Sequence, residues 1–204
     1  MTTSGLTRAR PLRPGVCALI VVDVQNGTFH DGLAATKPEF FATARDVTIP
    51  NLARAIAHCR AHGVEVIHTV IQNLTRDGRD RGLDYKLSGL GYPPGSWEAR
   101  VVDALAPTED EIVLAKSSSS LFNSTNIDYL LRNLGVTDVF VGGFLTDQCI
   151  DHTVKDAADR GYYANCLHDA CMAETYARHE AALACFRGYC RMLSTTEFLA
   201  LPLA

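Results

Sequence analysis

The stretch Cys17-Ala-Leu-Ile-Val-Val-Asp23 decides the fold, because six apolar residues follow one another without interruption and end on an acid. An apolar run without polar alternation is typical of a strand that is buried on both faces. Comparable runs recur along the chain and are bounded by glycine or charged residues. We therefore expect further strands at residues 64–71, 111–115, 138–143, 163–167 and 190–194.

Segments with helical spacing separate these strands. Apolar residues recur three and four apart from Ile49 to Ala57, and Gly63 is placed to end that helix. Ser96 is a candidate N-cap for a short helix to Leu105. Further helices are expected at residues 125–134, 147–160 and 175–187. This alternation predicts an α/β fold, a three-layer α/β/α sandwich around a six-stranded parallel sheet, with the strand order left open.

Composition restricts the classes of protein to which the chain can belong. It has 204 residues, a formal net charge of −4 and 47% hydrophobic residues, which suits one globular domain without a basic face for nucleic acid. The longest nearly apolar run, 16–22, is too short to span a membrane, and no secretory signal follows Met1. We expect a cytoplasmic protein, with a flexible leader at 1–14 that is ordered only if something docks it, and a domain at 15–204.

Seven cysteines in a chain without an export signal argue against a disulfide framework. Cys166 and Cys171, and likewise Cys185 and Cys190, have a spacing that superficially suggests zinc. However, Cys185 falls inside a predicted helix rather than on a tight knuckle. We interpret these cysteines as buried, inert thiols, and predict neither a metal nor a cofactor.

Three chemically notable residues follow predicted strands. Asp23 and Lys116 end the first and third strands, and Cys149 begins a helix after the fourth. Ligands bind beyond the carboxyl ends of parallel strands, so the fold can bring these side chains together. The helix N-terminus and a nearby ammonium should lower the pKa of Cys149 below the usual value near 8.5, and Asp23 can accept the thiol proton. The glycines at 142–143 let the backbone run close to a ligand, so that amides near Cys149 can form an oxyanion hole.

Each residue taken alone has a plainer interpretation. An Asp after a strand is often a loop cap, a Lys there is usually a solvated charge, and a Cys in a first helical turn is usually structural. The combination needs further support, which comes from three longer segments. They are Val21-Val-Asp-Val-Gln-Asn26, Lys116-Ser-Ser-Ser-Ser-Leu-Phe122 and Gly143-Phe-Leu-Thr-Asp-Gln-Cys-Ile150.

In this order and spacing, the three segments resemble the isochorismatase-like hydrolase superfamily, in its cysteine hydrolase (amidohydrolase) branch, over residues 16 to 200. The resemblance implies a catalytic triad of Asp23, Lys116 and Cys149. It also implies a cis peptide bond between Phe144 and Leu145, and an oxyanion hole made by the amides of Leu145 and Cys149. Members are commonly oligomers, so a homodimer or homotetramer is expected.

The substrate class follows from departures within this resemblance. Nicotinamidases carry an Asp-x-His pair after the second strand to hold a metal, whereas this chain has Ile71-Gln72-Asn73, and His68 is interpreted as a buried structural residue. Isochorismatases proper lack the nucleophilic cysteine. The remaining expectation is cleavage of a C–N bond in a small amide or ureido compound through a thioester. Candidate substrate-binding residues are Gln25, Phe29, Gln72, Tyr85, Trp97, Phe144 and Gln148.

Several alternatives stay open at this point. The long segment 72–97 is a candidate lid, and its arginines Arg76, Arg79 and Arg81 either hold a substrate carboxylate or keep the loop soluble. The aromatic residue of the family's segment after Asp23 falls one position late here, at Phe29. A non-catalytic redox sensor using Cys149, and an ester or lactam hydrolase using the same triad, are the rival functions.

Overall fold

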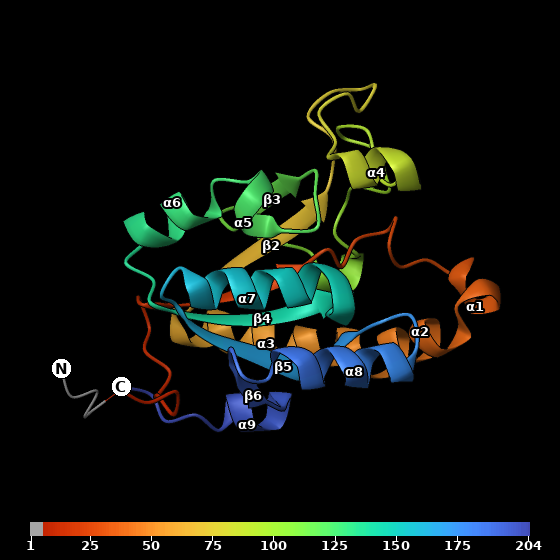
Figure 1. Ribbon diagram of the computed structural model, residues 1–204. Coiled ribbons are helices and arrows are strands. Elements are labelled where there is room, and N and C mark those ends of the chain that lie inside the picture. Colours follow the sequence, from red (N-terminus) through yellow and green to blue (C-terminus); the bar gives the residue numbers. More distant parts are fainter. Residues whose placement is uncertain (1–5) are drawn as a thin grey trace.

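A computed structural model describes residues 6–204, and its centre is a parallel sheet between two layers of helices (Figure 1). The sheet has six strands in the order β3-β2-β1-β4-β5-β6, and each neighbouring pair is parallel. The predicted fold class is confirmed. The strands are β1 (Cys17–Val22), β2 (Glu65–Ile71), β3 (Ile112–Lys116), β4 (Asp138–Phe144), β5 (Tyr163–Met172) and β6 (Arg191–Leu193).

The strand order places the functional crevice. From β1 the chain builds outward through β2 and β3, then crosses back to add β4, β5 and β6 on the other side. The direction of winding therefore reverses between β1 and β4, where Val22 pairs with Gly143. In doubly wound sheets this switch point opens a crevice beyond the carboxyl ends of the strands. The sequence left the strand order open, and with it the position of this crevice.

The two helical layers bury alternate residues of the same strands. Leu19 and Val21 of β1 face the cluster beneath α3 and α9, whereas Ile20 faces the cluster beneath α6, α7 and α8. Burial on both faces explains why β1 reads as a continuous apolar run. The helices are α1 (Leu33–Thr36), α2 (Pro38–Thr43), α3 (Ile49–His62), α4 (Leu83–Ser88), α5 (Leu121–Ser124), α6 (Ile127–Asn133), α7 (Asp151–Asp159), α8 (Tyr176–Phe186) and α9 (Thr195–Leu199). Two π-helical turns, η1 (Ala44–Thr48) and η3 (Thr146–Ile150), and the 3-10 turn η2 (Asp103–Leu105) join them.

The helix predicted from Ser96 to Leu105 is wrong. This segment instead runs alongside the chain that follows β1: the Asn26 and Gly27 amides donate to Arg100 O and Glu98 O at 2.9 Å, and only η2 is helical. Its backbone groups are thus satisfied by a distant segment rather than by a helix of its own. The helix after Thr125 is present, and its N-cap residue is Asn126, whose side chain makes no capping hydrogen bond. Thr125 Oγ1 instead accepts from the amide of Ile127, the first helical residue, at 3.1 Å.

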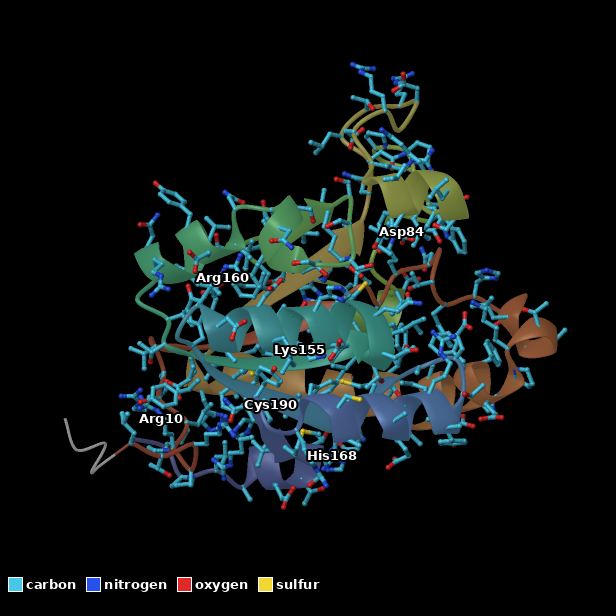
Figure 2. All side chains as sticks on the ribbon, in the orientation of Figure 1. Arg10, Asp84, Lys155, Arg160, His168 and Cys190 are labelled. Atoms are coloured by element: carbon cyan, nitrogen blue, oxygen red, sulfur yellow. The ribbon has the colours of Figure 1, made fainter. Side chains whose placement is uncertain are left out.

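The described part of the predicted leader, residues 6–14, contacts the domain. Leu12 is fully buried and forms a β-bridge with Leu203, while Arg10 and Arg13 pair with the Asp138 carboxylate at 2.8 and 3.0 Å. Figure 2 labels Arg10 at this docking site. The sequence analysis predicted that this segment would be ordered only if it docked, and residues 6–14 do dock on the domain. Residues 1–5 of the predicted leader lie outside the described residues. Within residues 6–204, no helix is both long and apolar enough to cross a membrane.

Candidate active site

Asp23, Lys116 and Cys149 lie together at the switch point of the sheet. Lys116 Nζ is 2.8 Å from Asp23 Oδ2 and 3.3 Å from Cys149 Sγ. Asp23 directly follows β1, Lys116 ends β3, and Cys149 lies in η3 just beyond β4. All three side chains are buried, with at most 4% of their surface exposed. The sheet thus brings an acid, an ammonium and a thiol within contact of one another.

The Asp23 carboxylate is held by a partner that the sequence analysis did not single out. Thr69 of β2 donates from Oγ1 to Asp23 Oδ1 at 2.8 Å, and its carbonyl accepts from the Asp23 amide at 3.0 Å. Asp23 also has a φ of 56°, which is uncommon for a residue other than glycine. Such backbone conformations cluster at functional sites, where surrounding contacts maintain them. No motif marked Thr69, because it lies within an ordinary strand.

Gly143 allows β4 to approach β1 beside the site. Its φ is 127°, and a Cβ at this position would lie 2.1 Å from Val22 O. No side chain fits there, which gives a physical reason for the glycine that precedes the cysteine turn. The peptide bond between the two residues that follow, Phe144 and Leu145, is cis.

The turn that carries Cys149 is fixed on several sides. The Ile150 amide donates to Leu145 O at 3.2 Å, and Thr153 Oγ1 donates to Cys149 O at 2.6 Å. Asp147 forms an ion pair with Arg178 of α8 at 2.5 Å. The helix predicted to begin at Asp147 therefore starts as the π-helical turn η3 and continues as α7.

Electrostatics in the buried site differ from the sequence-based expectation. Burial raises the pKa of Cys149 to about 11, the Lys116 ammonium lowers it in part, and the Asp23 carboxylate raises it further. The predicted lowering of this pKa is therefore wrong, since desolvation and a neighbouring anion outweigh the ammonium. Burial alone would lower the pKa of Lys116, but Asp23 and Cys149 raise it above its usual value. At rest the site holds a neutral thiol beside an ion pair.

A cavity of about 720 Å³ opens onto Cys149. Leu145 and Gln148 line it on the nucleophile's side, and Phe144 and Phe40 add apolar wall. Tyr85 also lines it, and its hydroxyl accepts a hydrogen bond from Lys116 Nζ at 3.2 Å and lies 3.9 Å from Cys149 Sγ. Burial raises the pKa of Tyr85, so it remains a neutral phenol. The cavity thus combines apolar walls with polar groups near the thiol.

The structure places the predicted substrate-binding residues in two groups. Tyr85, Phe144 and Gln148 line the cavity, whereas four others lie outside its lining. Gln25 is fully buried. Its side-chain amide donates to Ile71 O and to Glu98 O, and its Oε1 accepts from the Ile71 amide. The other three are Phe29, stacked on Phe41; Gln72, which accepts from the Gly95 amide; and Trp97, which is 55% exposed.

The structure decides between the two roles left open for the loop arginines, and it adds a cavity wall from early helices that were not predicted. Arg81 donates to Gly78 O and Leu90 O, and Arg79 pairs with Asp77, so these two brace the loop. None of the three candidate arginines lines the cavity in the described structure. Instead, Lys37 lines it from the junction of α1 and α2. Residues 30–43 carry no recognisable motif and no long apolar period, so no sequence pattern predicted this wall of the cavity.

His68 and the cysteines outside the site have surroundings that suit structural roles. His68 is fully buried in β2, and burial lowers its pKa to about 4. Cys166 and Cys171 are buried with their sulfur atoms 4.0 Å apart, while Cys185 is exposed on α8. Within residues 6–204, no three His, Cys, Asp or Glu side chains gather in a way that could hold a metal ion.

Comparison with known proteins places the chain. The family model for the isochorismatase domain matches residues 17–198. The chain belongs to the isochorismatase family. This confirms the resemblance found in the sequence and the expectation of a hydrolase.

Named relatives and solved structures agree with this placement. Ureidoacrylate amidohydrolase RutB of Methylobacterium radiotolerans is 33% identical over 204 residues, covering 86% of this chain and 76% of that protein. N-carbamoylsarcosine amidase of Arthrobacter sp. is 32% identical, over 71% of this chain and 55% of that protein. An isochorismatase family protein of Desulfovibrio vulgaris has a similar structure, with a TM-score of 0.78 and 30% identity, covering 90% of this chain and 96% of that one.

Proposed function

We propose that this protein is a cysteine-dependent hydrolase that cleaves a C–N bond of a small amide or ureido compound through a thioester. The observation that carries the proposal is the position of Lys116 Nζ, 2.8 Å from the Asp23 carboxylate and 3.3 Å from the Cys149 thiol. Asp23 and Cys149 line a cavity of about 720 Å³, which suits a small molecule. The relatives named as an amidohydrolase of ureidoacrylate and an amidase of N-carbamoylsarcosine support this choice of substrate.

The first step is proton transfer coupled to attack. Asp23 accepts the Cys149 proton as general base, and the sulfur adds to the substrate carbonyl. This transfer moves a negative charge from oxygen to sulfur, and the Lys116 ammonium contacts both groups. The number of buried charges stays the same, so forming the thiolate in this buried site does not require the desolvation of an additional charge. The amides of Leu145 and Cys149 are assigned to the oxyanion of the tetrahedral intermediate.

The second half returns the proton. The tetrahedral intermediate collapses to a thioester as protonated Asp23 donates to the departing nitrogen. Water then enters the cavity, Asp23 takes one of its protons, and the water oxygen adds to the thioester carbonyl. The C–S bond then breaks to release the acid, and Asp23 returns the proton to the Cys149 sulfur. The Tyr85 hydroxyl, near both Lys116 and Cys149, offers a neutral polar contact to the substrate's carbonyl or amide group. The mechanism uses no cofactor.

The rival functions make different demands on the thiol. A redox sensor needs an exposed thiolate, whereas Cys149 is 4% exposed and has a pKa raised by burial to about 11. These features favour a nucleophile that is activated only when substrate is present. An ester or lactam hydrolase would use the same triad. It would release an acid without ammonia, so measuring ammonia separates it from a hydrolase of open-chain amides or ureides.

The test combines a substrate screen with two variants. Ammonia release is measured over a panel of small amides and ureides, and hydroxylamine is added during turnover to trap the thioester as a hydroxamate. Cys149→Ala should abolish both signals while keeping the fold, and Cys149→Ser should keep at most a small residual rate. Turnover by Cys149→Ala at the wild-type rate would end the proposal, as would turnover without any hydroxamate.

A further inference from the structure

The hydroxyl of Tyr85 reaches the triad from outside the sheet. Tyr85 lies on α4, which stands outside the two helical layers (Figure 1). The amide of Gly82, just before α4, donates to Ser117 O at 3.0 Å, which holds the start of this short helix beside the residue that follows Lys116. Tyr85 is 2% exposed, and its hydroxyl contacts both Lys116 and Cys149. The segment after β2 thus delivers a polar group to a site built at the ends of β1, β3 and β4.

The Lys116 ammonium has fewer protons than acceptors. Four acceptors lie around its three N–H groups, and they are Asp23 Oδ2 at 2.8 Å, Ser118 O at 2.9 Å, the Tyr85 hydroxyl at 3.2 Å and Cys149 Sγ at 3.3 Å. At least two of these acceptors must share a proton, so the ammonium does not give each of them a full hydrogen bond. A thiolate formed at Cys149 therefore gains from a second donor.

The Tyr85 hydroxyl can be that donor. Its oxygen accepts from Lys116 Nζ, so its own proton is directed at another group. Buried hydroxyls have a hydrogen-bond partner in most proteins, and Cys149 Sγ lies 3.9 Å from this one. Burial raises the pKa of Tyr85, so the phenol keeps its proton. In the proposed first step the thiol proton goes to Asp23, which leaves the sulfur as the acceptor in its contact with Tyr85.

We propose that Tyr85 is a fourth catalytic residue, whose hydroxyl donates a hydrogen bond to the Cys149 sulfur while Asp23 removes the thiol proton. This inference rests on the proposed function and adds to it a donor for the sulfur itself, beside the contact with the substrate. One proton moves from sulfur to the Asp23 carboxylate, and Tyr85 keeps its own. Hydrogen bonds to an ionised acceptor are shorter and stronger, so this contact tightens as the thiolate forms and lowers the barrier to attack.

The other titratable side chains of the cavity lining have different surroundings. Lys37 forms an ion pair with Glu174. His152 contacts a backbone carbonyl through Nδ1 at 2.8 Å, and Asp84 is exposed on α4. Among residues 6–204, none of these four is hydrogen-bonded to the Cys149 sulfur. A change in the reactivity of the thiol can therefore be assigned to the groups that contact it.

Alkylation of Cys149 tests this role without a substrate. Tyr85→Phe removes the hydroxyl, in a Cys185→Ser background that lacks the exposed thiol. Alkylation by iodoacetamide, which needs the thiolate, is followed by peptide mass analysis between about pH 7 and pH 9. We expect a rate about three- to tenfold lower in Tyr85→Phe, because less thiolate is present and its higher reactivity offsets only part of the loss. Lys116 keeps three acceptors for its three protons, so the variant should fold, which circular dichroism checks.

Two comparisons separate the hydroxyl from a change in access to the thiol. N-ethylmaleimide is bulkier than iodoacetamide, so loss of thiolate lowers both rates by a similar factor, whereas a reshaped cavity changes them unequally. Tyr92→Phe removes a hydroxyl of the same segment that donates to Gly27 O at 2.7 Å, and it should keep the wild-type alkylation rate. An unchanged rate in Tyr85→Phe would overturn the inference, as would unequal factors for the two reagents or an equal fall in Tyr92→Phe.

Turnover separates failure of this inference from failure of the proposed function. With a cleaved compound of the amide and ureide panel, kcat of Tyr85→Phe should fall by about tenfold. Alkylation at the wild-type rate together with a raised KM would restrict Tyr85 to binding the substrate and leave the hydrolase intact. Slower alkylation of Tyr85→Phe without ammonia release from any compound by the wild type would contradict the hydrolase, while the hydrogen bond to the sulfur stands.

Discussion

Thr69 shows how a residue without a motif can set the geometry of a catalytic group. Its hydroxyl donates to Asp23 Oδ1 at 2.8 Å inside the protein, while Lys116 holds Oδ2 at 2.8 Å. Thr69→Val removes the hydroxyl but keeps the shape of the side chain. A hydrogen bond to a charged group contributes about 1.5–3 kcal/mol, so we expect kcat to fall by about tenfold or more in the ammonia-release assay.

Thr69→Ser is the matched control, because it retains the hydroxyl. It should keep most of the activity, and the KM of both variants should stay close to that of the wild type, since Thr69 does not line the cavity. A purely structural role would instead lower kcat in both variants in proportion to their loss of stability. Equal activity of Thr69→Val and wild type would contradict the positioning role.

Single residues also show where sequence reasoning succeeded and where it did not. Asp23, Lys116 and Cys149 were singled out by their places at strand ends, because parallel strands deliver those ends to one edge of the sheet, and the family resemblance joined them into a triad. The direction of the Cys149 pKa was predicted wrongly, because a sequence does not show that the thiol is 4% exposed beside a carboxylate. Lys37 and Glu174 were missed, because 137 residues separate the two partners.

At the scale of elements, the contact between β1 and β4 is the critical one. Gly143 adopts a φ of 127°, and a Cβ there would lie 2.1 Å from Val22 O and 2.7 Å from Val22 N. Both contacts are with backbone, which cannot rotate away as a side chain can. Gly143→Ala should therefore push the strands apart next to Asp23 and the Cys149 turn. We expect a loss of at least about 3 kcal/mol in the free energy of unfolding, together with loss of activity.

Gly135→Ala is a suitable control for this prediction. Gly135 also has a positive φ, of 72°, but a Cβ there meets nothing within 4 Å. Gly135→Ala therefore introduces the backbone strain of a positive φ without a steric clash. Denaturant unfolding should show a smaller loss in the free energy of unfolding, of about 1 kcal/mol, with activity retained. Equal losses in the two variants would mean that backbone strain, rather than the close approach of β1 and β4, explains the glycine.

The elements that sequence patterns located best are those that the core determines. The strands β1, β2 and β4, and α3 with its apolar face, stand close to their predicted bounds, whereas β5 continues to Met172, beyond its predicted end at residue 167. Elements held by distant partners were not predictable. The carbonyls of Glu98 and Arg100, for example, accept hydrogen bonds from the amides of residues 26–27 and not from amides of a helix of their own. Similarly, the π-helical turn η3 depends on contacts with α8 that no local pattern encodes.

For the whole molecule, buried thiols tie stability to alkaline pH. Burial raises the pKa of Cys17, Cys59 and Cys190 to about 12, and that of Cys149 to about 11. A group whose pKa is higher in the folded state stabilises the protein fully below the pKa of the unfolded chain. That stabilisation is lost as pH rises toward the folded value. The free energy of unfolding should therefore fall from about pH 9 upward, by up to about 1.4 kcal/mol per pH unit for each thiol.

Denaturant unfolding under reducing conditions measures this dependence between about pH 8 and pH 9.5, a range in which most tyrosines of the unfolded chain stay protonated. Cys59→Ala removes one fully buried thiol, so its stability should start lower but fall less steeply with pH than that of the wild type. Cys185→Ser removes an exposed thiol and should keep the wild-type slope. Because a packing defect shifts the whole curve without tilting it, the slope isolates proton linkage from the cavity that the alanine leaves. Identical slopes in all three proteins would show that thiol burial does not set the alkaline limit of this fold.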